Sequence, residues 1–224
     1  RAEKEVFVKV LWDLYKDEPN WIPPLIMERM DAIDEKKNPY FQHADVRFWI
    51  AYKNEKPVGR ISAQIDKLVP EHHGVNTGHY GFFDCIDDQE VANALFDTAS
   101  NWLKENNMIE VIGPFCLSIN EETGMLVEGH DTPPRLLMGH SRPYFEKLVK
   151  GAGLTKIKDT WAYKLDISEP ILPPTVQKLV DRAVAKGQVT FRPINMDKYE
   201  EELKIILDIF NDAWIENWKY IPFT

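Results

Sequence analysis

The sequence predicts an α/β (α+β) fold, in which helices flank a mixed, mostly antiparallel central sheet. Two runs of alternating apolar and polar residues, 46–52 and 57–66, are joined by the turn KNEK, which favours an antiparallel hairpin. A third run, from Tyr80 to Ile86, is apolar on both faces and therefore predicts a central strand. An amphipathic helix is expected directly after this strand.

Two helices are expected before the hairpin. The first extends to about Asp17 and carries apolar residues at helical spacing, namely Phe7, Val10, Leu11, Leu14 and Tyr15. A shorter helix is predicted from about Leu25 to Ile33. The polar segment that follows contains an Asn38–Pro39 step, which favours a turn.

The helix after the central strand has the clearest local pattern. Asp87 precedes Glu90 by three residues, which is the spacing of a capping box, and Asn106 and Asn107 indicate the helix end. Its apolar face contains Val91, Leu95, either Thr98 or Ala99, and Trp102. These residues would pack this helix against the sheet.

The next part of the chain predicts a strand, a long connection, a helix and a last strand. The strand lies within 108–119 and bends at Gly113 and Pro114. Connections as long as 120–143 are usually functional or carry short structure of their own. A helix is expected from Pro143 to Leu148, and a final strand from Thr160 to Ile167.

Three segments are expected along the chain. Residues 1–167 form a first domain, 168–187 form a linker with a helix, and 188–224 begin a second domain that is cut short. This second part reads as a strand, 188–195, followed by a long helix with an apolar stripe that needs a partner. Because the chain begins at Arg1 already in helical periodicity, residues before it are also expected to be missing.

Composition excludes several classes of protein. The chain has 224 residues, 44% of them hydrophobic, which is enough for a core. A formal net charge of -9 argues against nonspecific nucleic-acid binding and against binding to anionic membranes. The two cysteines do not suggest a disulfide framework, and no apolar run approaches the roughly 18 residues of a spanning helix. We therefore expect a soluble, cytoplasmic protein without nucleic-acid or membrane partners.

The order of these elements resembles the acetyltransferase fold of the GNAT superfamily. The resemblance covers about residues 1–167, with a weaker repeat of strand and helix after Val189. It rests on the hairpin with VGRISAQID, the strand GFFDCI, the helix QEVANALFDTASNWLKEN and the strand EVIGPFCLSI. Such a fold implies a central strand pair that splays apart, and an enzyme that transfers an acyl group to the amine of a small-molecule substrate.

The resemblance also implies a site for acetyl-CoA as co-substrate in the splayed cleft, with the pyrophosphate at the next helix N-terminus. The corresponding cofactor-binding residues are Cys85, Ile86, Gln89, Glu90, Val91 and Asn120. The superfamily carries a Gly-x-Gly or Gly-x-Ala run there, whereas this chain has DDQEVA. Two interpretations stay open: a helix start capped by Asp87, or a modified loop whose backbone amides still reach phosphate.

Three residues are candidates for catalysis. Tyr144 matches the superfamily tyrosine that protonates the departing CoA thiolate, although packing is the alternative. Glu122, in the polar segment 118–124, is the candidate general base, with a simple turn as the alternative. Asp84, on the central strand, is placed to act as a base or to position water, unless it is only buried there.

Other chemistry is disfavoured by the pattern. His72, His73 and His79 share one loop but lack the spacing of a tetrahedral metal set, so no metal site is expected. Neither Ser118 nor Ser141 lies in a nucleophile-elbow pattern. The two cysteines, Cys85 and Cys116, lie in apolar strands and are expected to be inert core thiols.

Two functions from different classes follow. The first is an acyl-CoA-dependent N-acyltransferase, in which the amine attacks the thioester directly. The second is a degenerate GNAT-like domain with a binding or structural role, catalysis residing in the second domain. A hydrolase that uses the same cleft ranks third. The aromatic C-terminal helix would be covered by the second GNAT-like domain or by a homodimer partner.

Overall fold

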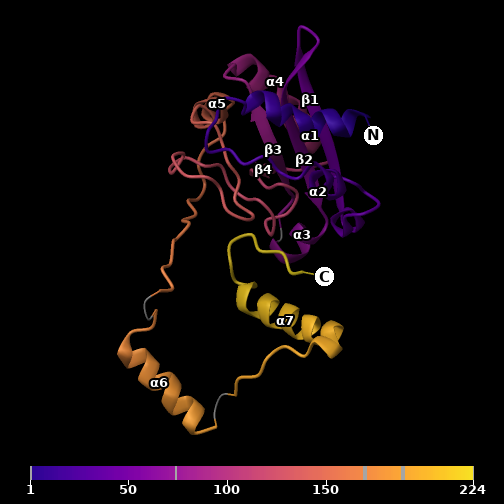
Figure 1. Cartoon of the computed structure of the whole chain (residues 1–224). Coiled ribbons are helices and arrows are strands. Elements are labelled where there is room, and N and C mark those ends of the chain that lie inside the picture. The colour runs from indigo at the N-terminus through magenta and orange to yellow at the C-terminus, as the bar shows by residue number, and fades with distance from the viewer. Residues whose placement is uncertain (1, 74, 169–170, 188–189, 224) are drawn as a thin grey trace. The chain divides into compact units, whose positions relative to one another are not determined.

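The computed structural model describes residues 2–73, 75–168, 171–187 and 190–223. The chain divides into two compact units (Figure 1). The first unit comprises the residues up to Ile157 together with Glu216–Ile221, and the second comprises Lys158–Ile215 and the residues from Pro222.

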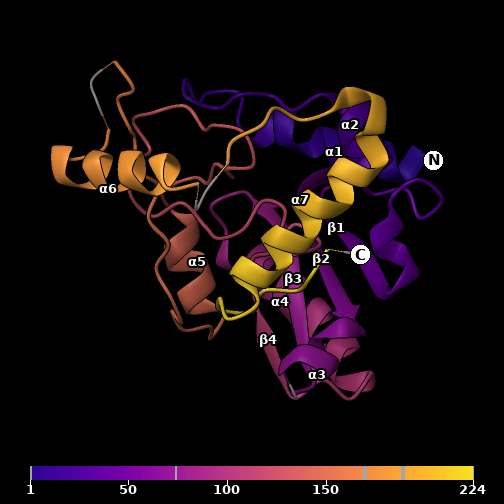
Figure 2. The same ribbon diagram turned by 90° about the horizontal axis from the view of Figure 1, so that it is seen from below.

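The first unit is built around one four-stranded sheet in the order β1-β2-β3-β4. Its strands are β1 (Ala44–Lys53), β2 (Lys56–Asp66), β3 (Thr77–Cys85) and β4 (Glu110–Ile112). The first three pair antiparallel, and β4 pairs parallel with β3. Figure 2 shows β4 at the edge of the sheet beside β3. The predicted mixed, mostly antiparallel sheet is thus confirmed.

The predicted hairpin of β1 and β2 is also confirmed. Its turn residues Asn54 and Glu55 both have positive φ, at 51° and 63°. Two successive residues with positive φ are typical of the mirror-image turns that suit the twist of a hairpin. The register places Trp49 opposite Ile61, so the apolar face of one strand continues on the other.

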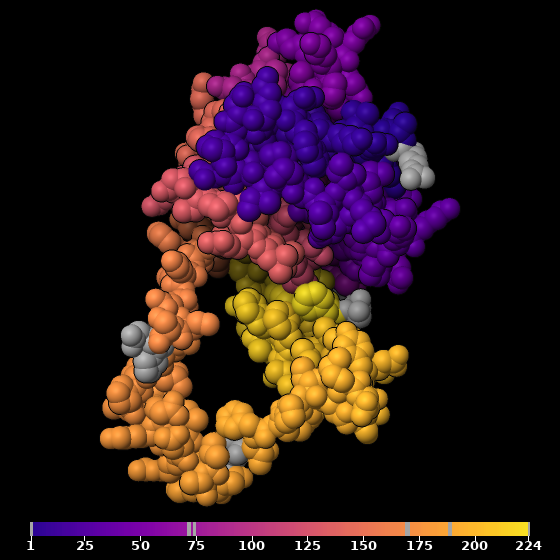
Figure 3. Space-filling model, viewed as in Figure 1, coloured from indigo at the N-terminus to yellow at the C-terminus, as the bar shows by residue number. Residues whose placement is uncertain are grey.

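Helices cover the sheet and close two core clusters. They are α1 (Ala2–Leu14), α2 (Ile26–Ala32), α3 (Leu68–His73), α4 (Gln89–Glu105) and α5 (Phe145–Gly151). Neighbouring residues of β1 pack into different clusters, Trp49 with α4 and Phe48 with Phe7 of α1. Figure 3 shows α1 in indigo on the surface of the first unit. β1 therefore packs half-buried apolar side chains on both of its faces.

Several predicted boundaries are wrong. The N-cap of α4 is Asp88 and not Asp87, because the Asp88 carboxylate is the group that accepts the Glu90 amide. The expected loop before Tyr80 contains α3, and β3 already begins at Thr77. The helix expected from Pro143 begins at Phe145. These shifts of a few residues are usual where a helix start depends on which carboxylate takes the free amides.

Two predicted strands are shorter or missing. The strand within 108–119 is reduced to β4, because the chain turns away at Gly113 and leaves only an isolated bridge between Phe115 and Thr123. Residues 160–167 form no strand, although apolar side chains alternate along them, and these side chains are exposed. Alternation predicts the strand conformation, but a strand also needs a neighbouring edge.

The second unit contains two main helices, α6 (Pro174–Ala185) and α7 (Tyr199–Trp214). α6 has a proline in its first turn, where a backbone amide has no acceptor within the helix, so the missing N–H of proline costs nothing there. Arg192 donates two hydrogen bonds of 2.8 Å to the Glu202 carboxylate. The strand predicted over 188–195 does not form over 190–195, and its first two residues lie outside the described residues.

The segment Glu216–Ile221 packs within the first unit. The carbonyl of Tyr220 lies 3.0 Å from the His73 ring nitrogen Nε2. The Trp218 ring contacts the Phe115 ring edge-on. Tyr220 and Ile221 are buried. This segment is therefore part of the core of a unit from which it is distant in sequence.

Gly81 allows the chain that follows β4 to cross β3 closely. The Phe115 amide donates to the Tyr80 carbonyl at 2.8 Å, and a Cβ at Gly81 would lie 1.8 Å from the Phe115 carbonyl oxygen. We expect Gly81→Ala to lower the free energy of unfolding by more than about 3 kcal/mol or to prevent folding, because backbone must move. Urea unfolding measures this. Gly139→Ala is the control, since the atom nearest to its added Cβ would be 3.9 Å away. A free energy of unfolding that Gly81→Ala leaves unchanged would contradict the close crossing.

His79 makes the stability depend on pH. Burial, and then the Lys219 ammonium, lower the pKa of His79 from 6.5 to about 4. The unfolded chain therefore binds a proton between these values that the folded chain does not, and stability falls as the pH falls through this window. We expect the loss of unfolding free energy from pH 7 to pH 5 to be roughly 2 kcal/mol larger in the wild type than in His79→Leu. Denaturant titrations at both pH values measure it; equal losses would refute the shift.

Candidate active site

A cavity lies in the first unit, where β3 is no longer paired with β4. β3 and β4 pair over only three residues, from Thr77 to His79 on β3. Beyond them, the C-terminal half of β3 faces the cavity instead of a strand. The lining includes polar residues, among them Tyr15, Arg29, Arg60, Asp84, Glu122, His140 and Ser141, and apolar residues, among them Leu11, Trp21, Ile22, Met125, Met138 and Phe145. A cleft of this kind suits a ligand with an apolar part and a polar group.

Asp84 is held in a buried hydrogen-bond network. Its Oδ2 accepts from Arg60 Nε at 2.9 Å and lies 2.8 Å from Arg60 Nη2, and its Oδ1 accepts from the Tyr15 hydroxyl at 2.7 Å. All three residues are buried. Burial, and then the charge of Asp84, raise the pKa of Tyr15, so that this hydroxyl stays a donor.

Glu122 reaches the cavity from the loop after β4. Its carboxylate accepts a hydrogen bond from the Arg29 guanidinium of α2, and both side chains are half-buried. The Glu122 carbonyl accepts from the Cys116 amide at 2.9 Å, which fixes this loop. Burial raises the pKa of the Cys116 thiol to about 12, so it remains protonated.

Tyr144 precedes α5 and is not among the residues that line the cavity. Its hydroxyl donates to the Cys85 carbonyl at 2.8 Å, at the end of β3. Burial raises the pKa of Tyr144 to about 12. Burial also raises the pKa of the Cys85 thiol, which fits the expectation of an inert core cysteine.

The start of α4 does not fit a pyrophosphate. The Asp88 carboxylate accepts from the Glu90 amide at 2.9 Å, so a donor that a phosphate needs is occupied, and this carboxylate would repel a phosphate. Lys53 Nζ lies 2.6 Å from Asp88. The Ile86 amide donates to Val58.

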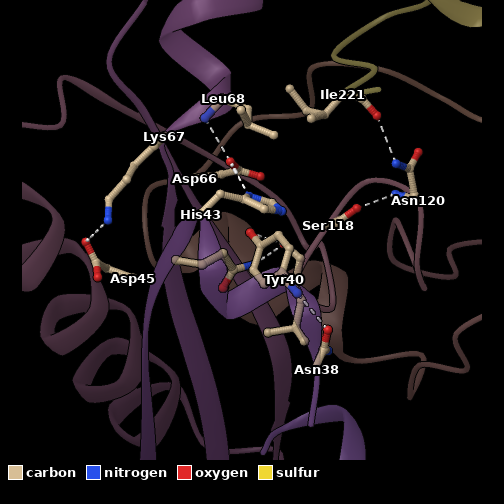
Figure 4. Close-up of polar contacts among 12 residues, drawn as sticks. Asn38, Tyr40, His43, Asp45, Asp66, Lys67, Leu68, Ser118, Asn120 and Ile221 are labelled. Atoms are coloured by element: carbon tan, nitrogen blue, oxygen red, sulfur yellow. Dashed lines mark hydrogen bonds and ion pairs between the residues drawn. The ribbon is translucent and has the colours of Figure 1, made fainter. Parts of the chain in front are cut away.

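The two remaining predicted cofactor residues have other contacts. Gln89 Nε2 donates to the Leu148 carbonyl and to the Asn93 side chain, both at 2.9 Å, and thereby joins α4 to α5. Asn120 Nδ2 donates to the Ile221 carbonyl at 3.0 Å, as Figure 4 shows. The structure brings only Asp84 and Glu122, of the nine predicted site residues, to the described cavity lining.

Sequence reasoning missed four polar residues around the cavity: Tyr15, Arg29, Arg60 and His140. A signal for Arg60 exists, because a charged residue inside an apolar strand needs a partner, and the register places it opposite Asp84. Tyr15 belongs to the apolar stripe of the first helix and gives no separate signal. His140 lies in a loop without a pattern.

Two curated proteins are similar to the chain over its whole length. One is described as bacterial ceramide synthase, from Caulobacter vibrioides (strain NA1000 / CB15N), with 43% identity over 224 residues and 58% of that protein covered. The other is described as protein YghO, from Escherichia coli (strain K12), with 41% identity and 57% covered. The chain thus spans less than three fifths of the length of these relatives. No family model matches the chain, and no solved structure matches it.

The buried ion pair yields a stability prediction. Asp84→Asn leaves the Arg60 guanidinium in the core without a counter-charge. We expect it to lower the free energy of unfolding by about 3 to 5 kcal/mol. Asp45→Asn is the matched control, because Asp45 and Lys67 are exposed and lie 3.6 Å apart (Figure 4); its cost should stay below about 1 kcal/mol. Chemical denaturation measures both, and equal costs would contradict the role of the buried pair.

Proposed function

We propose that the chain belongs to an N-acyltransferase that forms an amide between an acyl group and a long-chain amine. The observation that carries the proposal is the cavity beside β3, which combines two carboxylates with apolar walls. The similarity to a protein described as bacterial ceramide synthase supports it. A ceramide is an amide of a fatty acid and a long-chain amino alcohol, so its synthesis requires this reaction.

In this proposal the polar end of the cavity holds the amine. The Glu122 carboxylate attracts the ammonium group in competition with Arg29. Asp84 contributes negative charge deeper in the cavity. The apolar walls would then take the hydrocarbon part of the amine or of the acyl group.

The acyl donor in this proposal is an acyl-CoA. The superfamily resemblance suggests acetyl-CoA, whereas the apolar walls favour a longer acyl chain. Tyr144 remains the candidate acid for the departing thiolate, because its hydroxyl keeps its proton, although burial raises its pKa and so weakens it as an acid. The phosphates would have to bind elsewhere than on α4, because Asp88 occupies that helix start.

The capped start of α4 also favours a second candidate function. A GNAT-like unit without a phosphate site would bind the amine or support a catalytic domain without catalysing the reaction. The additional length of the relatives leaves room for such a domain.

An amide-forming assay tests the proposal. The 224-residue chain is incubated with sphinganine and either acetyl-CoA or palmitoyl-CoA, and the amide is measured by mass spectrometry and free CoA by thiol titration. We expect amide with palmitoyl-CoA, and a decrease in kcat/KM of about 100-fold for Glu122→Gln and about 10-fold for Tyr144→Phe.

Glu146→Gln is the matched control, because Glu146 pairs with Lys150 on the exposed side of α5. Its kcat/KM should equal that of the wild type. The full-length Caulobacter relative serves as the positive control. If that relative forms amide and the chain neither forms amide nor binds either acyl-CoA in calorimetry, the second candidate is favoured and the catalytic proposal fails.

A further inference from the structure

Both carboxylates that the sequence suggests as bases contact guanidinium groups. Asp84 is held by Arg60 and by the Tyr15 hydroxyl, and Glu122 is held by Arg29. An alkylammonium substrate has to lose a proton before its nitrogen can attack a carbonyl carbon. The proposed reaction therefore calls for a proton acceptor in the cavity that is not already neutralised by a cation.

His140 has the properties of such an acceptor. It lines the cavity, and its side chain is only 3% exposed. Both ring nitrogens are buried, and neither has a hydrogen-bond partner among the residues that the structure describes. Buried nitrogen atoms without partners are rare in folded proteins, and a catalytic role is one explanation for them. The Tyr15 hydroxyl, which donates to Asp84, lies 3.0 Å from the His140 carbonyl oxygen, so the His140 backbone lies beside the Asp84 network.

The surroundings of the ring contain one carboxylate and two basic side chains. Glu18 Oε1 lies 3.7 Å from His140 Nε2, and Glu18 Oε2 lies 3.3 Å from Arg142 Nη1. The His130 ring centroid is 6.4 Å away. Burial lowers the pKa of His140, with smaller contributions in the same direction from His130 and Arg142, while Glu18 opposes the shift. The neutral ring is the form that accepts a proton.

We infer that His140 is the general base of the cavity and that Glu18 stabilises the imidazolium it forms. The inference rests on the proposed function, because it assigns the proton acceptor of that reaction. Glu18 acts here as a positioning residue, since it contacts the ring and not the substrate. Its carboxylate is near enough to stabilise a charged ring without holding the neutral one in a hydrogen bond.

The reaction balances with these groups. One proton of the ammonium group passes to His140, and the freed electron pair of the nitrogen attacks the thioester carbonyl carbon. The carbon–sulfur bond then breaks and its electron pair stays on sulfur. The second proton leaves the nitrogen as the amide forms and passes to the thiolate, which gives the free thiol of CoA. His140 finally returns its proton to water.

The test compares His140→Ala with the wild type in the sphinganine and palmitoyl-CoA assay. We expect kcat/KM to fall at least about 100-fold and added imidazole to restore it at least tenfold in the variant alone. The acidic limb of the wild-type pH profile should lie below the ordinary histidine range and be absent from the variant. His43→Ala is the control, because it removes a histidine–carboxylate pair outside the cavity.

Structural loss is separated from catalysis by two further measurements. His140→Gln keeps the volume and should lose activity while its thermal unfolding stays close to that of the wild type. NMR of the wild-type histidine rings should show a neutral His140 at pH 7. A protonated His140 at this pH, or His140 variants within threefold of wild-type kcat/KM, overturns the inference and leaves the proposed function intact. Absence of amide from the wild-type chain, with the Caulobacter relative active, overturns both.

Discussion

The buried ion pair between Arg60 and Asp84 is the interaction on which the cavity depends. Arg60 comes from β2 and Asp84 from β3, and they lie opposite each other in the register. The remaining donors and acceptors are filled by Tyr15 and by the Phe7 carbonyl of α1. A buried pair is tolerated only when its hydrogen bonds are complete, so these contacts fix α1 on the sheet beside the cavity.

Charge in the cavity is paired, and under the proposed function this limits which amines would bind. Among the described lining residues, two guanidinium groups face two carboxylates, and His140 is the histidine that the proposed chemistry uses. A ligand with a single charge has to compete with an internal partner, which favours an amine that also gains from apolar contact. Affinity for a small polar amine would therefore be weak.

The fold was largely predictable, whereas the cavity was not. The hairpin of β1 and β2 and the helix α4 could be predicted from the local periodicity of residues 46–66 and 89–105. The predicted strand at 160–167 does not form, because strand pairing depends on a free sheet edge elsewhere in the fold, which local periodicity does not reveal. Asp84 and Glu122 were found because carboxylates near a strand end are conspicuous, but the cations that hold them and the loop position of His140 depend on tertiary contacts.

The first unit is discontinuous in sequence, because Glu216–Ile221 returns to it after the second unit. Closing so long a loop costs entropy that grows only with the logarithm of its length, so the buried Tyr220 and Ile221 suffice to offset much of it. A fragment that ends at Ile157 would expose the surfaces of Phe115 and His73 that this segment covers. Cutting the chain after Ile157 would thus remove a piece of the first unit. A fragment meant to contain the whole unit has to include Glu216–Ile221 as well.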